Sequence, residues 1–431
     1  MGCCGDTKFK TAHFESVRHE MDKLEIRSYD KKLFKDIYYI QGKTINKWEV
    51  TSMEFYRDTW AEIDLDAVKW NVEKTVEQLD SSVFLYAVVK ANAYGHGDVQ
   101  IAQAALRAGA KGLAVAFLDE ALKLRAAGIQ EPILVLGASR PEDAHLAAAG
   151  RISLTVHDEE WLQKACVHKG QVLNIHIKCD TGMGRIGLKT EEELQRAVTQ
   201  ITESNQFAFE GIFTHFATAD EEETAYLEKQ LARFRQLLHS LEQLPPYIHC
   251  SNSAATLRFK GAGFNAVRLG ISMYGLTPST EIVHLLPFSL KPAFSLKSKL
   301  VHVKKLEPGE KVSYGATYEA SEQEWIGTLP IGYADGWIRK LGGQDVLVDG
   351  RRAPIVGRIC MDQCMVRLSR EYNPGTLVTL IGQQQNEEIT MEEIAEKRET
   401  INYEIPCVIT ARVPRIYIEN GKRVSIVNPL L

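Results

Sequence analysis

A lysine at the end of an apolar, valine-rich segment is the residue of this chain best suited to chemistry. Lys90 directly follows the run Phe84–Val89, which is typical of a buried strand, and precedes a polar loop that contains Gly95 and Gly97. Because burial disfavours the charged form of an amine, Lys90 is pushed towards the neutral nucleophile that forms Schiff bases. The alternative is a lysine that ends a strand and extends its ammonium group to solvent.

Other polar side chains stand where further apolar runs end. They are Lys178, Asp180, His215, Asn252, Ser253 and Arg268, the last of which is followed by Gly270. Each has an ordinary explanation when taken alone, such as a hydrogen-bonded core histidine, a helix-capping serine or a surface arginine. Because five predicted strands present such groups at the same end, the sequence favours an active site at the carboxyl ends of the strands.

The elements that would position these residues alternate between β-rich runs and amphipathic helical stretches. The expected strands are 84–90, 112–117, 132–137, 152–156, 173–178, 209–216, 247–252 and 266–270. The expected helices lie near 66–79, after Asp119, after a capping box at Thr190–Glu193, and over 220–241. Eight strands separated by helices predict a (β/α)8 barrel of the TIM type.

A doubly wound sheet that binds a dinucleotide is the alternative fold. The segment Gly182–Gly187 has the spacing of a dinucleotide-binding glycine loop and precedes a predicted helix. However, Lys178 and Asp180 occupy the strand end just before it, and no acid suited to binding a ribose follows convincingly. A single match of this kind is weak, and we therefore favour the barrel.

Beyond residue 290 the pattern changes to consecutive strands joined by tight turns. Strands are expected at 294–306, 312–318, 325–333, 345–348, 353–359, 365–368 and 377–381. Asp349-Gly350 and Asn420-Gly421 are strong hairpin signals, and one helix is expected near 390–397. The sequence therefore predicts a barrel domain over residues 53–290 and a mostly β domain over residues 291–431.

Composition argues against several classes of partner. The formal net charge of −5 comes with no basic stripe, so a nucleic acid is not expected as a partner. No apolar run approaches the roughly 18 residues that a membrane span requires. The eight cysteines form no Cys-x-x-Cys pair, which favours reduced thiols in the cytoplasm over disulfides or a metal site. Residues 1–52 have no sustained period, and we treat them as an extension with no assigned role.

The segment Phe84–Gly97, with the sequence FLYAVVKANAYGHG, closely resembles the lysine motif of the alanine racemases, which use pyridoxal 5′-phosphate (PLP). The resemblance extends from about Met53 to Pro429. Its other motifs are Met53–Trp60, Asp180–Arg185, Val312–Tyr318, Ile331–Trp337 and Gly357–Gln363. We see no departure from the family pattern at a catalytic position.

The resemblance implies which residues hold the cofactor. Lys90 would form an imine with the aldehyde of PLP, and the phosphate would lie at the loops after the last two barrel strands, a common phosphate site of such barrels. The implied cofactor residues are Lys90, Tyr94, His215, Asn252, Ser253, Arg268, Gly270, Ile271 and Tyr403. Arg268 would face the ring nitrogen. Because an arginine cannot accept the proton of that nitrogen, the ring would be a weaker electron sink and transamination would be limited.

The resemblance also implies a two-base mechanism in a homodimer. Racemisation removes a proton from one face of Cα and returns a proton to the other, which requires acid–base groups on opposite sides of the cofactor. Lys90 would be one of these groups and Tyr314 of the partner subunit would be the other. Arg185 and Met361 would bind the substrate carboxylate, and Lys178 matches a lysine that is carbamylated in some members.

These residues predict an enzyme that interconverts L-alanine and D-alanine on a PLP aldimine and supplies D-alanine for peptidoglycan. A racemase of broader specificity, acting on serine or lysine, is an alternative that the sequence leaves open. Arg268 counts against a second alternative, an amino-acid decarboxylase of the same plan. Tyr314 and the β domain count against a third, a non-catalytic carrier of PLP. No metal is expected.

Overall fold

The computed structural model describes residues 37–40, 43–46 and 55–431 of the chain. Strands β1 (Ile37–Ile40) and β2 (Lys43–Asn46) pair antiparallel in a first unit. The rest of the predicted N-terminal extension, with Cys3 and Cys4, lies outside the described residues. The second unit, Arg57–Leu431, carries every candidate site residue and is described below.

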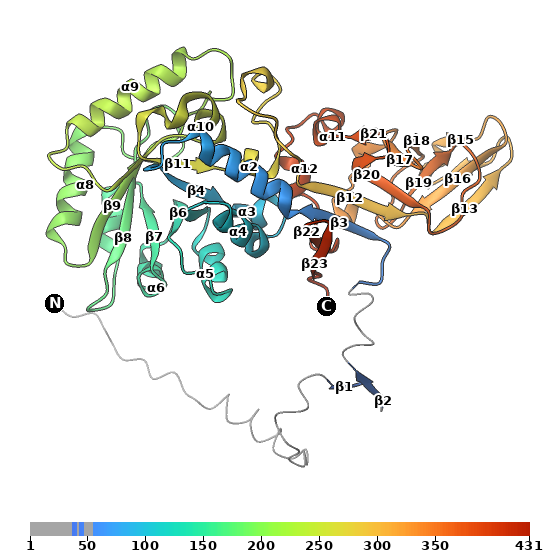
Figure 1. Ribbon diagram of the computed structural model, residues 1–431, viewed down its shortest axis with the longest axis horizontal. Coiled ribbons are helices and arrows are strands. Elements are labelled where there is room, and N and C mark those ends of the chain that lie inside the picture. Colours follow the sequence, from blue (N-terminus) through green and yellow to red (C-terminus); the bar gives the residue numbers. More distant parts are fainter. Residues whose placement is uncertain (1–36, 41–42, 47–54) are drawn as a thin grey trace. The chain divides into compact units, whose positions relative to one another are not determined.

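Eight parallel strands of the second unit close into a barrel (Figure 1). Their order follows the chain, and the last strand pairs with the first through Arg268 and Tyr86. The strands are β4 (Phe84–Val88), β5 (Gly112–Val115), β6 (Ile133–Ala138), β7 (Ile152–Val156), β8 (Leu173–Lys178), β9 (Phe207–Phe213), β10 (Tyr247–His249) and β11 (Ala266–Leu269). Closure confirms the predicted (β/α)8 barrel and excludes the doubly wound sheet, which is open.

Helices alternate with these strands along the chain. They are α2 (Leu65–Gln78), α3 (Lys90–Tyr94), α4 (Asp98–Arg107), α5 (Leu118–Ala126), α6 (Ala144–Ala149), α7 (Glu159–Lys164), α8 (Glu191–Glu203), α9 (Ala225–His239) and α10 (Ser253–Phe259). The predicted capping box is present at the start of α8. The Thr190 hydroxyl accepts from the Glu193 N–H at 3.2 Å, and the Glu193 carboxylate accepts from the Thr190 N–H at 3.0 Å.

Helix α9 begins at Ala225, later than the predicted Asp220. Side chains from other parts of the chain bind the backbone before it. Arg258 donates to the carbonyl of Ala219 at 2.7 Å and to that of Glu221 at 2.5 Å. These carbonyls therefore have partners outside the helix, and tertiary contacts override a local pattern that favours helix.

The C-terminal part of the second unit is a mostly β sheet, as predicted (Figure 1). Its strands are β3 (Thr59–Asp64), β12 (Phe294–Lys299), β13 (His302–Leu306), β16 (Glu324–Leu329), β17 (Asp345–Val348), β18 (Arg351–Val356), β19 (Cys364–Leu368), β20 (Leu377–Gln384), β21 (Glu387–Ile389), β22 (Arg415–Glu419) and β23 (Lys422–Val427). The predicted helix is α11 (Met391–Arg398), and α12 (Glu404–Cys407) follows it. Both predicted hairpin turns are present, with φ of 51° and 69° at Asp349 and Gly350.

Three segments differ from their predicted arrangement. The predicted strand 294–306 is divided into β12 and β13, which are not neighbours in the sheet. Strand β3 lies between β12 and β22 of the second sheet, although the sequence places it at the start of the barrel domain. Its alternating pattern fits either sheet, so the sequence of one strand does not identify its distant partners. The predicted strand 312–318 is broken into β14 (Lys311–Val312) and β15 (Tyr318–Glu319), because the backbone between them forms a tight turn with φ of 66° at Ser313.

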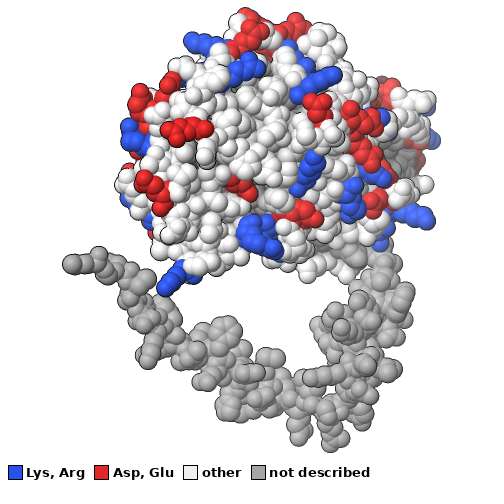
Figure 2. Space-filling model, turned by 60° about the vertical axis from the view of Figure 1, so that its left-hand side comes forward, with Lys and Arg blue, Asp and Glu red and all other residues white. Residues whose placement is uncertain are grey.

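Charged side chains of both signs are interspersed on the visible face of the second unit (Figure 2). No basic stripe occurs on that face, so it offers no continuous track for a phosphate backbone. None of the helices in the described part of the chain combines the length and the apolar character needed to cross a bilayer.

Candidate active site

A cavity of about 820 Å³ lies at the mouth of the barrel, where loops after β4, β8, β9, β10 and β11 meet the segment between α11 and α12. Its volume is typical of sites that bind a cofactor or small ligand. Ten of the predicted site residues line it: Lys90, Tyr94, Arg185, His215, Asn252, Ser253, Arg268, Gly270, Ile271 and Tyr403. The expectation that polar residues at the strand ends gather in one place therefore agrees with the geometry.

Three predicted site residues do not line this cavity. Tyr314 and Met361 belong to the β domain, and their side chains are 72% and 53% exposed. Lys178 is buried, and its Nζ donates to the carbonyl of Cys179 at 2.7 Å. A single chain therefore does not bring Tyr314 to Lys90, and any joint action of the two requires a second copy.

The backbone after Lys90 forms a left-handed turn. Ala91, Asn92, Ala93 and Tyr94 have φ of 53°, 54°, 52° and 52°. For residues with a side chain this conformation costs about 1–2 kcal/mol each, and such backbone persists only where the surroundings impose it. The predicted strand 84–90 accordingly ends at Val88, and Lys90 is the first residue of the turn.

Glu120 and Gly95 hold this turn. The Glu120 carboxylate accepts from the Ala91 N–H at 2.6 Å and from the Ala116 N–H at 2.7 Å, so it ties the turn to the loop after β5. At Gly95, which has φ of 83°, a Cβ would lie 2.0 Å from the carbonyl oxygen of Pro406. A side chain is excluded there by both conformation and space.

We expect Glu120→Gln to destabilise the protein by about 1–3 kcal/mol. In the wild-type chain both carboxylate oxygens accept from backbone N–H groups, whereas in the variant one of these N–H groups would face the amide nitrogen of glutamine. Thermal denaturation would measure the change, and Asp119→Asn on the exposed side of the same helix start is the matched control. Equal melting temperatures for the two variants would show that Glu120 does not hold the turn.

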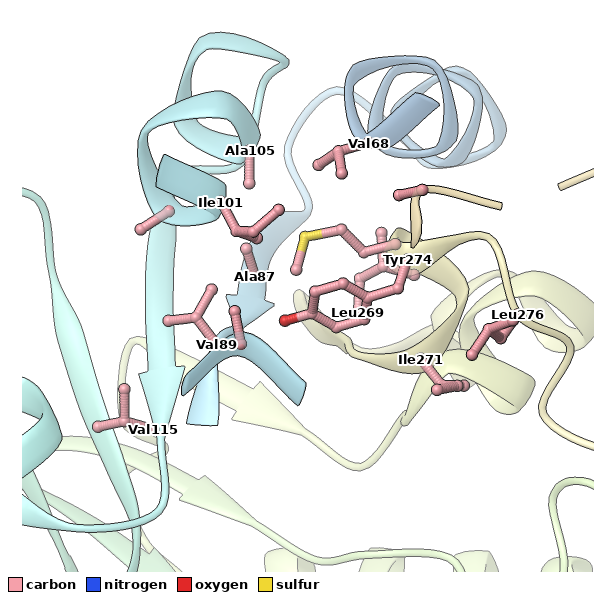
Figure 3. Packing of buried hydrophobic residues seen from close by; sticks show 14 of the residues in the cluster. Val68, Ala87, Val89, Ile101, Ala105, Val115, Leu269, Ile271, Tyr274 and Leu276 are labelled. Atoms are coloured by element: carbon pink, nitrogen blue, oxygen red, sulfur yellow. The ribbon is translucent and has the colours of Figure 1, made fainter. Parts of the chain in front are cut away.

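Tyr274 supports the turn from the barrel core (Figure 3). Its hydroxyl points towards the end of β4 and donates to the carbonyl of Val88 at 2.8 Å. Its ring centroid lies 4.9 Å from that of Tyr94 and 4.5 Å from that of His96. These rings, packed against Val89 and its apolar neighbours, fix Tyr94 where it borders the cavity.

Polar groups from three segments converge beside Gly270. The Ser253 hydroxyl accepts from the Gly270 N–H at 2.8 Å, and a Cβ on Gly270 would lie 2.9 Å from the Tyr94 hydroxyl oxygen. The side chain of Asn252 caps α10 by accepting from the Ala255 N–H at 3.0 Å. A side chain at this position would press on the Tyr94 hydroxyl, and the cradle of hydroxyl and amide groups suits a phosphate.

Arg268 is buried at the base of the cavity. Its Nη2 donates to the carbonyls of Thr214 and Cys250, both at 3.0 Å, and lies 3.2 Å from His215 Nδ1. Its Nη1 is hydrogen-bonded to His249 Nδ1. Burial lowers the pKa of Arg268 to about 10, so the group remains a cation at neutral pH. Burial, reinforced by the Arg268 charge, places the pKa of His215 well below its ordinary value.

Burial weakens the basicity of two lysines at the barrel mouth, the partly buried Lys90 and the buried Lys178. Burial lowers the pKa of Lys90, and the positive charge of Arg185 lowers it further. Burial lowers the pKa of Lys178 to about 8. A larger fraction of each amine is therefore neutral than in a solvated lysine, which favours attack of Lys90 on an aldehyde.

Several residues around the site were not predicted from sequence. Glu120 and Tyr274 carry no local signal, because an acid in a first helical turn and a tyrosine in a core are both ordinary. His176 and His249 are polar residues inside predicted apolar strands, which is the signal that could have identified them. In the described residues, six cysteines are free and no cluster of side chains is arranged to hold a metal ion.

Comparison with known proteins identifies relatives over nearly the whole described chain. The family model "Alanine racemase, N-terminal domain" matches residues 63–278, and "Alanine racemase, C-terminal domain" matches residues 293–417. The alanine racemase of Geobacillus stearothermophilus is 58% identical over 379 residues, covering 88% of this chain and 98% of that protein. Alanine racemase 1 of Bacillus subtilis is 55% identical over 383 residues, covering 89% and 98%.

Solved structures agree with this assignment. Alanine racemase from Bacillus anthracis with bound L-Ala-P has a TM-score of 0.85 and 52% identity, covering 88% of this chain and 99% of that one. A histidine racemase from Leuconostoc mesenteroides has a TM-score of 0.80 and 34% identity, covering 84% and 99%. The chain belongs to the alanine racemase family of isomerases.

Proposed function

We propose that the cavity at the barrel mouth is where this member of the alanine racemase family binds PLP and exchanges the Cα proton of alanine. The observation that carries the proposal is that Lys90, Arg268 and the cradle beside Gly270 border one cavity of suitable volume. They provide an amine for the aldehyde, a cation for the ring nitrogen and donors for the phosphate. PLP, when bound, supplies an electron sink for the charge that develops on Cα.

Each residue that borders the cavity then has a proposed role. Lys90 would hold the cofactor and move a proton at one face of Cα, and Arg268 would face the ring nitrogen with His215 beside it. The remaining cofactor contacts that we propose are Tyr94, Asn252, Ser253, Gly270, Ile271 and Tyr403. The fit is supported by the missing Cβ of Gly270, which leaves room for a phosphate next to the Tyr94 hydroxyl.

We propose that Arg185 orients the substrate carboxylate and that Tyr314 and Met361 complete the cavity of a second copy in a homodimer. Arg185 borders the cavity, whereas Tyr314 and Met361 are exposed. The loops that carry these two residues are joined, because the Ser313 hydroxyl donates to the carbonyl of Arg358 at 2.5 Å. One face of the β domain can therefore present both side chains to a partner.

Lys178 is proposed as a site of carbamylation. With a pKa of about 8, part of this amine is neutral at neutral pH, and the neutral amine is the form that combines with carbon dioxide. The cations Arg185 and Arg268 influence the same amine and would stabilise the resulting anion. Incubation with carbon-13-labelled bicarbonate should give a carbamate signal that is absent in Lys178→Ala.

We also propose the domain limits 53–290 and 291–431 and a cytoplasmic location, where D-alanine would be supplied to peptidoglycan. Barrel strands β4–β11 all precede residue 290 and strands β12–β23 all follow it. Strand β3 is the exception, since it pairs within the second sheet. Free cysteines in the described residues agree with a reducing compartment.

The direct test is to mix the purified protein and PLP with L-alanine and to follow the formation of D-alanine. L-Serine, L-lysine and L-histidine should be offered in parallel, because a relative at 34% identity is a histidine racemase. We expect alanine to be converted with the highest kcat/KM. A higher value for another amino acid would replace alanine as the substrate, and no conversion of any would refute the proposal.

Arg268→Glu should raise the yield of transamination products relative to racemisation by about tenfold or more, because a carboxylate can share the proton of the ring nitrogen and strengthen the electron sink. Pyruvate released from alanine measures the side reaction. Arg268→Lys, which retains a cation, is the control and should not raise the ratio. An Arg268→Glu variant that racemises with an unchanged ratio would show that Arg268 does not face the ring nitrogen.

A further inference from the structure

A chain of polar side chains runs from Arg268 through the interior of the barrel. Arg268 Nη1 is hydrogen-bonded to His249 Nδ1. His249 Nε2 lies 3.0 Å from His176 Nδ1, and His176 Nε2 lies 3.1 Å from the carboxylate of Glu210. Both imidazoles are completely buried, whereas the Glu210 side chain is 19% exposed. The chain therefore links the base of the cavity to a carboxylate that reaches solvent.

Arg268 stands at one end of this series of hydrogen bonds and Glu210 at the other. The chemistry of these two side chains fixes which group donates in each bond. Arginine can only donate, so His249 Nδ1 must accept and its proton must be on Nε2. That Nε2–H donates to Nδ1 of His176, which therefore also carries its proton on Nε2 and donates it to Glu210. Each bond thus donates away from Arg268, and the carboxylate is the final acceptor.

The protonation states of His249 and Glu210 agree with hydrogen bonds that donate from Arg268 towards Glu210. Burial, reinforced by the Arg268 charge, places the pKa of His249 well below its ordinary value, so the ring is neutral. Burial opposes ionisation of Glu210, but hydrogen bonds from His176, Ser153 and Asn174 outweigh it and lower the pKa of that carboxyl. A cation and an anion are therefore joined by two neutral imidazoles of fixed tautomer.

Packing alone does not account for this arrangement. The interiors of such barrels are filled mainly by branched apolar side chains. Here the His249 ring stacks on Phe213 at 4.7 Å, yet its nitrogens are both used in the chain. Buried polar groups are tolerated when every member is satisfied, and such networks hold their members in one arrangement.

We propose that Glu210, acting through His176 and His249, is a positioning residue that limits how strongly Arg268 donates a hydrogen bond into the cavity. An acceptor that is strengthened by a carboxylate draws positive charge towards one side of the guanidinium, and the other N–H groups become weaker donors. The inference rests on the proposed function, in which Arg268 faces the ring nitrogen of the cofactor. A weaker donor at that nitrogen leaves the ring a weaker electron sink.

The first test uses the wild-type chain. Nitrogen NMR of the protein with isotope-labelled histidine, recorded with and without cofactor, should show two neutral imidazoles protonated on Nε2 around neutral pH. His176→Asn and His249→Asn assign the signals. A proton on Nδ1 of either ring, or a doubly protonated ring, would overturn the proposal, whatever the behaviour of other variants.

The second test compares Glu210→Gln with Ser153→Ala. Glutamine retains an oxygen that can accept from His176 but removes the charge, so the ratio of transamination to racemisation should rise about threefold through the two intervening bonds. The absorbance band of the bound cofactor should also shift. Ser153 donates to the same carboxylate, and Ser153→Ala leaves the negative charge of Glu210 in place, so this variant should not raise the ratio.

The outcomes separate this inference from the proposed function. If Arg268→Glu raises the ratio and Glu210→Gln behaves as Ser153→Ala, the influence of Glu210 is refuted and the placement of Arg268 stands. If neither variant changes the ratio, the placement of Arg268 at the ring nitrogen fails, and the inference fails with it.

Discussion

Lys90→Ala should lower the rate of racemisation by about four orders of magnitude or more, because it removes both the attachment of the cofactor and one of the two acid–base groups. Activity with saturating PLP measures the loss. Lys90→Arg keeps a positive charge at the same place but cannot form an imine, and it should be equally inactive. An active Lys90→Ala variant would show that another amine does the chemistry.

Borohydride reduction provides an independent readout of the same residue. Reduction of the protein–cofactor linkage, followed by sequencing of the labelled peptide, should place the pyridoxyl group on Lys90. Lys178 is the matched control, since it is a second lysine at the end of a barrel strand and is buried. Lys178→Ala should leave the label on Lys90, and a label on Lys178 in the wild-type chain would contradict the proposal.

The position of Lys90 at the end of a barrel strand could be predicted from the local sequence. The apolar run before it predicts a buried strand, and the strand is β4 of the closed barrel. Because all eight strands are parallel, their carboxyl ends meet, and this brings Lys90, His215 and Arg268 to the same cavity. Chain order and hydrophobic pattern are sufficient for that prediction.

The conformation around Lys90 could not be predicted in the same way. Residues 91–94 contain no glycine, so the sequence gives no sign of four consecutive positive φ angles. The turn exists because Glu120, which follows a different strand, accepts from its backbone. Strand β3 is a similar case, since its partners β12 and β22 lie more than two hundred residues away in the chain. Long-range contacts of this kind leave no local pattern.

The predicted strand 312–318 was wrong for a related reason. β-formers dominate the segment, but Ser313, Gly315 and Ala316 have φ of 66°, 74° and 48°, and the strand is interrupted. The result is that Tyr314 projects from a tight turn into solvent instead of packing in a sheet. The exposure of Tyr314 supports the proposal that this residue completes the cavity of a second copy.

Mixing two inactive variants should restore activity if Tyr314 acts in the site of a partner subunit. Lys90→Ala chains retain Tyr314, and Tyr314→Phe chains retain Lys90. In a mixed dimer, the site of the Tyr314→Phe chain contains its own Lys90 and the partner's Tyr314, and is therefore native. The other site of the same dimer lacks both groups. Random reassociation of equal amounts should give about a quarter of the wild-type number of active sites, as follows from the two-fold symmetry of a homodimer.

The recovered activity must be compared with the activity of each variant refolded alone. Removing a general acid–base group typically costs about 10²- to 10⁴-fold in rate, so each parent preparation should be nearly inactive. Co-refolding the two chains and measuring alanine racemisation gives the recovered fraction, and each variant refolded alone is the control. If Tyr314 instead served the cavity of its own chain, every site of a mixed dimer would lack one group and activity would stay at the parent level. The 72% exposure of Tyr314 and its absence from the lining of its own cavity favour recovery.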